Sequence, residues 1–110
     1  MDRLNHYRQI IQQILEDYSR HRSDDQIESQ ALFDEKRDHY QVVNLGWENE
    51  QRVYGSVLHL DIKNNKIWLQ YNGTEIDIAQ TLVDLGVPKS DIVLGFQAPY
   101  RRQYTDYAVS

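Results

Sequence analysis

Four segments rich in β-branched and aromatic residues follow one another through links of only three to five residues, and this spacing constrains the fold most. The segments are residues 27–33, 39–47, 52–62 and 66–71. A parallel pair of strands needs a crossover of a dozen residues or more, which such links cannot provide. The sequence therefore predicts four consecutive antiparallel strands, a β-meander.

The link Asn64-Asn65 also predicts a register, because asparagine tolerates the positive φ that both central residues of a type I′ hairpin need. If Lys63 faces Lys66, apolar residues pair on one face: Ile62 with Ile67, Leu60 with Leu69 and Leu58 with Tyr71. The opposite face then carries Val57, His59, Asp61, Trp68 and Gln70. A slip by one residue would destroy this separation, so the pattern supports the register.

Two helices flank the predicted sheet. Apolar residues spaced by three and four from Leu4 to Tyr18 predict an amphipathic helix that stops near Ser19. The stretch 78–85 has a second apolar stripe, with Thr74 expected as its N-cap and Asp77 as a weaker form of the capping-box acid. Gly86 suits the left-handed position after a helix, and Pro88 prevents its continuation.

The predicted fold class is therefore α+β in a single domain, residues 1–110. Its parts are an N-terminal helix, a four-stranded antiparallel β-meander, a second helix and a short C-terminal strand or irregular arm. Residues 92–96 fit a short fifth strand and a buried loop equally well. Two helices of this size cover about one face of such a sheet, which leaves the other face open.

Composition excludes several classes of protein. There is no cysteine, which excludes disulfides, thiolate metal sites and a cysteine nucleophile. No apolar run reaches the length of a signal peptide or a membrane span, so a cytoplasmic protein is expected. Seventeen acidic residues against twelve Lys and Arg give a net charge of -5, a disadvantage for binding duplex DNA.

His59 and Asp61 are two residues apart on one predicted strand and so point to the same side. They could form a general-base pair or supply two ligands to a metal ion. A protein metal site needs at least a third ligand, and no spacing indicates one. We therefore predict no catalytic residue, no cofactor and no metal, and expect this histidine at a surface or interface.

The open sheet face is the predicted interface. If residues 49–50 form a second two-residue turn, aromatic and aliphatic side chains surround His59 on that face. Exposed patches of this kind usually mark interaction sites. We therefore expect burial in a homodimer or against a partner protein, through Tyr40, Val42, Val57, His59, Asp61, Trp68 and Gln70.

The C-terminal segment interleaves arginines with tyrosines, a composition found where proteins stack on bases or contact phosphates. Tyr100, Arg101, Arg102 and Tyr104 are therefore candidates for contact with nucleic acid or with a partner. The alternative, which we favour, is an arm whose tyrosines pack on the domain while its arginines pair with acidic residues.

Three stretches carry a family resemblance: "RDHYQVVNLGW", "RVYGSVLHLDIKNNKIWLQYNGTEI" and "LGVPKSDIVLGF". With them the chain resembles the XisI family, the fdxN element excision controlling factors of cyanobacteria, over essentially its whole length. The resemblance implies a role in controlling excision of a DNA element during differentiation of nitrogen-fixing cells. It also implies action beside a site-specific recombinase and a second factor, XisH, and supplies no catalytic residue set.

Three functional hypotheses follow. The first is a non-enzymatic adaptor that binds an XisH-like protein or the recombinase, or shields a nuclease-like partner as an antitoxin does. The second is direct DNA binding through Arg101 and Arg102. The third is a small hydrolase or ligand-binding domain around His59 and Asp61.

Overall fold

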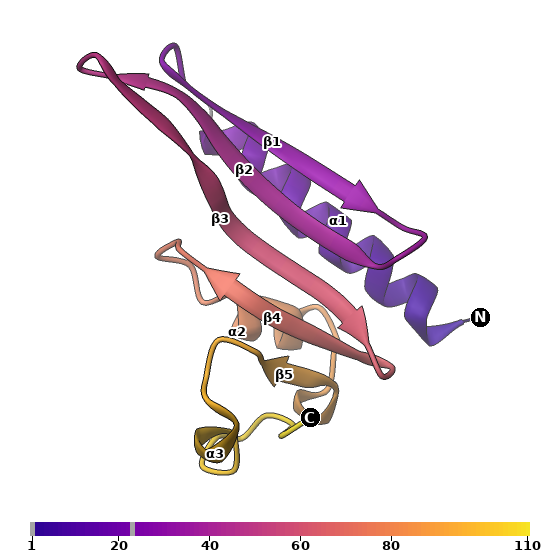
Figure 1. Ribbon diagram of the computed structural model, residues 1–110. Coiled ribbons are helices and arrows are strands. Elements are labelled where there is room, and N and C mark those ends of the chain that lie inside the picture. Colours follow the sequence, from indigo (N-terminus) through magenta and orange to yellow (C-terminus); the bar gives the residue numbers. More distant parts are fainter. Residues whose placement is uncertain (1, 23) are drawn as a thin grey trace.

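The chain folds into one five-stranded sheet with helices packed against it (Figure 1). The computed structural model describes residues 2–22 and 24–110. The strands are β1 (Ile27–Asp34), β2 (His39–Glu48), β3 (Gln51–Lys63), β4 (Lys66–Asn72) and β5 (Ile92–Leu94), and they lie in the order β1-β2-β3-β4-β5. The helices are α1 (Arg3–Arg22), α2 (Ile78–Asp84), the 3₁₀ turn η1 (Lys89–Asp91) and α3 (Pro99–Arg102).

This architecture confirms the α+β class and the antiparallel meander β1–β4. Residues 92–96, which fitted a strand and a buried loop equally well by sequence, contain a fifth strand, β5, which pairs parallel to β4. Helix α1 extends to Arg22, three residues beyond the predicted end near Ser19. Among the described residues, no helix combines the length and the apolar character needed to cross a bilayer.

Both predicted two-residue turns are present. Asn64 and Asn65 have φ of 54° and 64°, and Asn49 and Glu50 have φ of 51° and 68°. Positive φ at both central positions is the type I′ geometry that matches the twist of a hairpin. The pairs Lys63–Lys66, Ile62–Ile67 and Leu60–Leu69 form as the first of these turns predicts.

A β-bulge lies in β3 where it pairs with β2. From the turn the pairs run regularly as far as Val43–Ser56, but the next pair is Val42–Leu58, so Val57 has no partner on β2. Between β3 and β4 the register also shifts, and Leu58 faces Asn72 instead of the predicted Tyr71. Each extra residue reverses the face to which the following side chains point, because side chains alternate along a strand.

The bulge corrects the predicted position of two interface residues. Tyr40 and Val42 lie opposite Leu60 and Leu58, and both are 0% exposed within the core under the helices. A regular hairpin would have placed them beside His59 on the other face. Val57 also packs partly against this core rather than forming an open patch.

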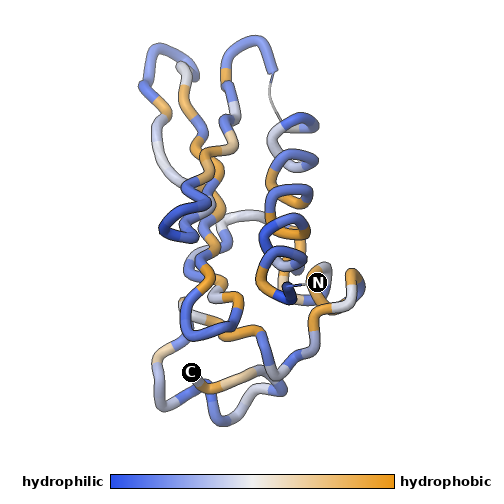
Figure 2. Tube along the Cα trace, turned by 90° about the vertical axis from the view of Figure 1, so that its right-hand side faces the viewer, coloured by the Kyte–Doolittle hydropathy of each residue, from blue (hydrophilic) through white to orange (hydrophobic). Residues whose placement is uncertain are grey.

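Helices α1 and α2 cover the same face of the sheet, and viewed edge-on α1 stands along one side of the strands (Figures 1 and 2). α1 contributes apolar side chains at helical spacing, among them Tyr7, Ile11 and Leu15. These meet the inward residues of the strands and of α2: Leu58, Leu60, Ile67, Leu69, Ile78, Leu82 and Ile92. The main core therefore lies between one sheet face and two helices.

The start of α2 differs from the prediction. Its N-cap is Asp77, whose carboxylate accepts from the backbone N–H of Gln80 at 3.1 Å, and not Thr74. Thr74 instead donates to the side chain of Asn72 at 2.6 Å and helps to close the preceding turn. At the other end Gly86 has φ of 102° and fills the left-handed position as predicted.

Helix α1 is tied to the β1–β2 turn by a two-point contact. The Arg8 guanidinium donates to the two carboxylate oxygens of Asp38 at 2.7 and 3.1 Å, and Tyr40 adds a hydrogen bond of 2.9 Å. The bond from Arg8 is the main cause that lowers the pKa of Asp38, although burial acts against it. A paired arrangement of this kind is stronger than an exposed ion pair because it fixes both charged groups.

The C-terminal arm, residues 95–110, runs beside β5 at the edge of the sheet, where Ala108 bridges to Val93, and its Arg102 reaches the sheet face opposite the helices. Arg102 lies over the ring of Trp68 at 5.2 Å and donates to the backbone oxygen of Gln97 at 3.1 Å. The Lys63 side chain also lies over this ring, with its Nζ at 4.6 Å, and Trp68 is only 7% exposed. The indole N–H donates to the Lys63 carbonyl at 3.1 Å. The expectation that another polypeptide covers Trp68 is wrong, because this chain's own arm covers it.

The tie between Arg8 and Asp38 predicts a pH-dependent stability. Asp38→Asn keeps a residue that tolerates the φ of 61° at this position but removes the charge. We expect a loss of about 1–3 kcal/mol at pH 7 in urea unfolding. Because the folded pKa of Asp38 is lowered, its contribution is present above the unfolded value of about 4 and disappears as pH falls through the folded value.

The matched control for this experiment is Arg20→Ala, which breaks the exposed pair between Arg20 and Asp17. It should cost less than about 0.5 kcal/mol at pH 7. Equal losses in the two variants, or a loss in Asp38→Asn that persists unchanged at low pH, would contradict this interpretation of the tie.

The covering of Trp68 predicts a fluorescence change. In a Trp47→Phe background, Arg102→Ala removes the arm's cation from the Trp68 ring and leaves Lys63 in place, whose Nζ lies 4.6 Å from the ring centre. The emission should shift to longer wavelength and acrylamide quenching should increase, because water reaches the indole. Arg101→Ala should change neither, and an unchanged spectrum in the Arg102 variant would show that the arm does not cover Trp68.

Candidate functional site

The sheet face opposite α1 and α2, called the outer face below, is organised in rows across the strands. Register places Asp34, His39, Asp61 and Trp68 in one row of directly opposed residues. The next row contains Leu32, Gln41, His59 and Tyr71. Directly opposed residues point to the same face, so these two rows bring β1 to β4 together in one surface.

A polar cluster lies where the two rows meet. His39 Nδ1 and His59 Nε2 both approach the same carboxylate oxygen of Asp61, Oδ1, at 2.9 and 2.8 Å. Gln70 donates its amide N–H to the other oxygen, Oδ2, at 3.1 Å. The Asp61 carboxylate therefore accepts three hydrogen bonds from three side chains on three strands.

These contacts set the charge of Asp61. Burial alone would raise the pKa of the Asp61 carboxyl, since only 13% of its side chain is exposed. The hydrogen bonds from His39, His59 and Gln70 outweigh burial and lower the pKa below its usual value. Asp61 is thus ionised at neutral pH, and an ionised carboxylate accepts hydrogen bonds from both imidazole rings.

The sequence predicted three members of this cluster and missed the fourth. His59, Asp61 and Gln70 lie together as expected, but His39 was not considered. His39 comes opposite Asp61 only because Val57 is unpaired. The signal was present: a regular hairpin puts the apolar Tyr40 and Val42 on the polar face, and one extra residue in β3 removes that conflict.

A hollow of about 460 Å³ opens above the cluster. It is lined by Leu32, Phe33, Asp34, His39, Gln41, His59 and Asp61. This lining offers imidazole and carboxylate groups but no hydroxyl, so it lacks the Ser or Thr nucleophile that an adjacent histidine base would activate. The arrangement therefore suits binding of a ligand or an ion better than hydrolysis.

Large apolar side chains stand exposed on the same outer face. Leu32, Trp47, Tyr54 and Tyr71 are 43%, 57%, 73% and 51% exposed. Trp47 and Tyr54 lie on the β2–β3 hairpin, where the Arg52 guanidinium stacks over the Trp47 ring at 5.4 Å. The pairing of β3 with β4 begins only at Leu58, so among the described residues the β4-side edge of residues 51–56 has no strand partner.

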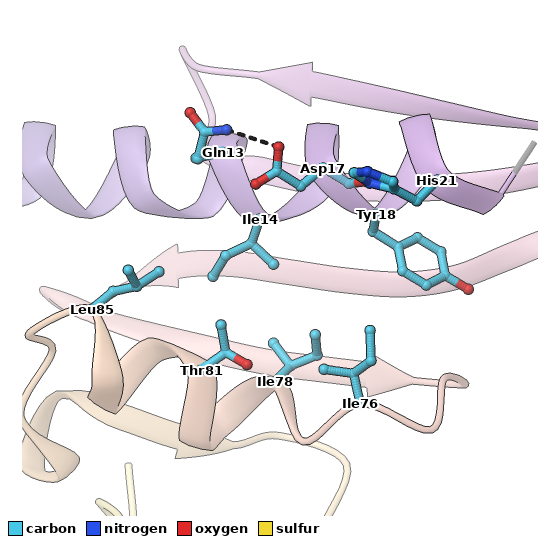
Figure 3. A pocket seen from close by; sticks show the side chains of 9 residues that line it. All are labelled: Gln13, Ile14, Asp17, Tyr18, His21, Ile76, Ile78, Thr81 and Leu85. Atoms are coloured by element: carbon cyan, nitrogen blue, oxygen red, sulfur yellow. Dashed lines mark hydrogen bonds between the residues drawn. The ribbon is translucent and has the colours of Figure 1, made fainter.

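A second hollow, of about 520 Å³, lies between α1 and α2 on the other side of the molecule (Figure 3). Ile14 and Tyr18 on α1 face Ile76, Ile78 and Leu85 across it. Its polar groups are engaged within their own helices: Gln13 donates to Asp17, and Thr81 to the Asp77 carbonyl. This groove is an apolar contact surface with no convergent polar groups.

The predicted residues of the C-terminal segment do not form a basic patch. Tyr100 and Tyr104 are 65% and 81% exposed, and Arg101 lies beside Tyr100. Arg102, however, lies over Trp68 and donates to backbone oxygens of Gln97 and Gly95, so it holds the arm in place. The arm thus resembles the structural alternative: Tyr107 packs partly against the core, whereas Tyr100 and Tyr104 remain largely in solvent.

Comparison with known proteins identifies the family. The profile described as XisI protein matches residues 1–109. A XisI-like protein from Anabaena variabilis ATCC 29413 is 48% identical, with a TM-score of 0.93 over 98% of this chain and 100% of that one. The fdxN element excision controlling factor XisI from the same strain is 35% identical, with a TM-score of 0.87 over 99% and 100%. A search of curated proteins found no match. This chain belongs to the XisI family.

Proposed function

We propose that this protein is a non-enzymatic controlling factor for site-specific excision of a DNA element, the fdxN element or a related one. It acts by binding an XisH-like protein or the site-specific recombinase through its outer face. Family membership supports the regulatory role, since a solved relative bears the name fdxN element excision controlling factor. The partner and the surface are inferred from the chemistry of this chain.

The observation that carries the proposal is the exposed aromatic pair Trp47 and Tyr54 on the β2–β3 hairpin. Tryptophan, tyrosine and arginine are the residues that most often dominate binding energy at protein interfaces. Arg52 stacks on Trp47 and fixes the orientation of the ring, which lowers the entropy lost on binding. Leu32 and Tyr71 extend the apolar surface across the sheet.

The edge of β3 beside this pair supports a polypeptide partner. Its unpaired backbone groups over residues 51–56 can receive an added strand, a common mode of peptide recognition. The net charge of -5 favours a partner with a basic surface, such as a protein that itself binds DNA. A second copy of this chain could use the same edge, and the homodimer expected from the sequence is one measurable outcome.

Direct DNA binding and catalysis have less support. Only Arg101 of the two tail arginines is free to contact phosphates, because Arg102 is held over Trp68. The hollow above Asp61 contains no hydroxyl nucleophile. A non-enzymatic adaptor therefore accounts for more of the exposed surface than either alternative.

The test is retention of a purified XisH-like protein from the same genome by this protein on a column. Replacement of both aromatics, Trp47→Ala with Tyr54→Ala, should lower the affinity at least about thirtyfold, the loss of about 2 kcal/mol that a single hot-spot residue contributes. The matched control is Ile76→Ala with Leu85→Ala, which removes comparably exposed apolar groups from the groove between α1 and α2. It should leave binding unchanged.

The outcomes separate the hypotheses. Loss of binding in the groove variant alone would reject the outer face as the interface. Failure of wild type to retain either the XisH-like protein or the recombinase would reject the adaptor. A dimer mass in light scattering that the Trp47 and Tyr54 replacements convert to a monomer would assign this surface to self-association instead.

A further inference from the structure

The cluster around Asp61 has a donor set that the proposed adaptor function does not use. We propose that His39, His59 and Asp61 bind one divalent transition-metal ion of the Zn²⁺ class. The inference is independent of any partner protein, because all three ligands come from this chain. The sequence predicted no metal because the residue spacing indicated no third ligand beside His59 and Asp61. In the structure, His39 supplies that third ligand.

The donor chemistry fits such an ion. Two imidazole nitrogens with one carboxylate oxygen are ligands that Zn²⁺ and related first-row ions accept, whereas Ca²⁺ and Mg²⁺ prefer oxygen alone. The absence of thiolates is consistent with a site of this mixed type. Three protein ligands also leave coordination positions for water or another small donor.

The geometry is largely preformed. His39 Nδ1 and His59 Nε2 lie 2.9 and 2.8 Å from the same oxygen of Asp61. All three candidate ligand atoms lie within 4.8 Å of one another. Zinc contacts its nitrogen and oxygen ligands at about 2.0–2.2 Å, so small side-chain rotations suffice to surround one ion. The neighbouring strands β2 and β3 hold the ligands, and strands fix ligand positions better than loops do.

A supporting residue orients the carboxylate. Gln70 donates to Asp61 Oδ2 at 3.1 Å, which leaves Oδ1 directed towards the two histidines. Gly95 makes room for this amide: a Cβ at that position would lie 2.5 Å from Gln70 Oε1. In metal sites, residues that hydrogen-bond to a ligand without contacting the metal orient that ligand and strengthen metal binding.

The site is accessible from solvent. The His39 side chain is 58% exposed, and the hollow of about 460 Å³ leads to the cluster. The Asp61 side chain lies deeper, at 13% exposed, where its charge is less screened by water. An ion can therefore enter through the hollow and meet a partly buried anionic oxygen at its base.

The competing explanation is structural: the histidines and Asp61 simply join β2 to β3 by hydrogen bonds. Both explanations use the same distances, but they differ in what the purified protein binds. A structural cluster takes up no metal, whereas a metal site takes up one ion per chain. The four histidines of the chain supply an internal control, because His6 and His21 lie on α1, away from the cluster.

The test uses the full chain with its purification tag removed and two metal probes. Co²⁺ titration followed by visible absorption reports the ligand environment, and Zn²⁺ titration calorimetry reports affinity and stoichiometry. Wild type should bind one ion, with ligand-field bands in the Co²⁺ form. His39→Ala and Asp61→Asn should each lower the affinity at least a hundredfold, and Gln70→Ala should lower it about 10–100-fold.

The control His21→Ala should bind as wild type does, and circular dichroism should show that each variant is folded. His39→Ala decides the question even if Asp61→Asn disturbs the sheet, because His39 is mostly exposed. Absence of metal uptake by wild type would overturn the proposal. So would binding that survives in His39→Ala but is lost in His21→Ala.

Discussion

Side chains on a β-strand alternate between the two faces of a sheet, so one unpaired residue reverses the face of every residue that follows. In this protein that residue is Val57 in β3. It turns Tyr40 and Val42 towards the helices, where both are fully buried, and His39 towards Asp61. The core and the polar cluster thus depend on the same local irregularity.

The two faces that result have different roles. One is closed by α1 and α2 and supplies the core of the domain. The outer face is covered by the chain's own arm only around Trp68, through Arg102, and remains open along the hairpin with Trp47 and Tyr54. The candidate metal ligands lie on this face, beside the exposed apolar residues. Binding of a partner and binding of an ion would therefore occur on one continuous surface.

Local signals in the sequence were sufficient for the strands and their turns, because Asn64, Asn65 and Asn49 tolerate the positive φ that they adopt. The bulge could not be predicted in this way, since Val57 is an ordinary strand residue and its unpaired state reflects the packing of Tyr40. The cover over Trp68 was also missed, because it depends on Arg102, far along the chain. Hence His59 and Asp61 were predicted as neighbours, but their third partner was not.

The register of β2 against β3 is the central claim, and interstrand NOEs in solution measure it most directly. The structure predicts NOEs that join His39 to Asp61 and Gln41 to His59. A regular hairpin without the bulge would instead join Tyr40 to His59 and Val42 to Val57. Observation of that second set would contradict the account of both the core and the cluster.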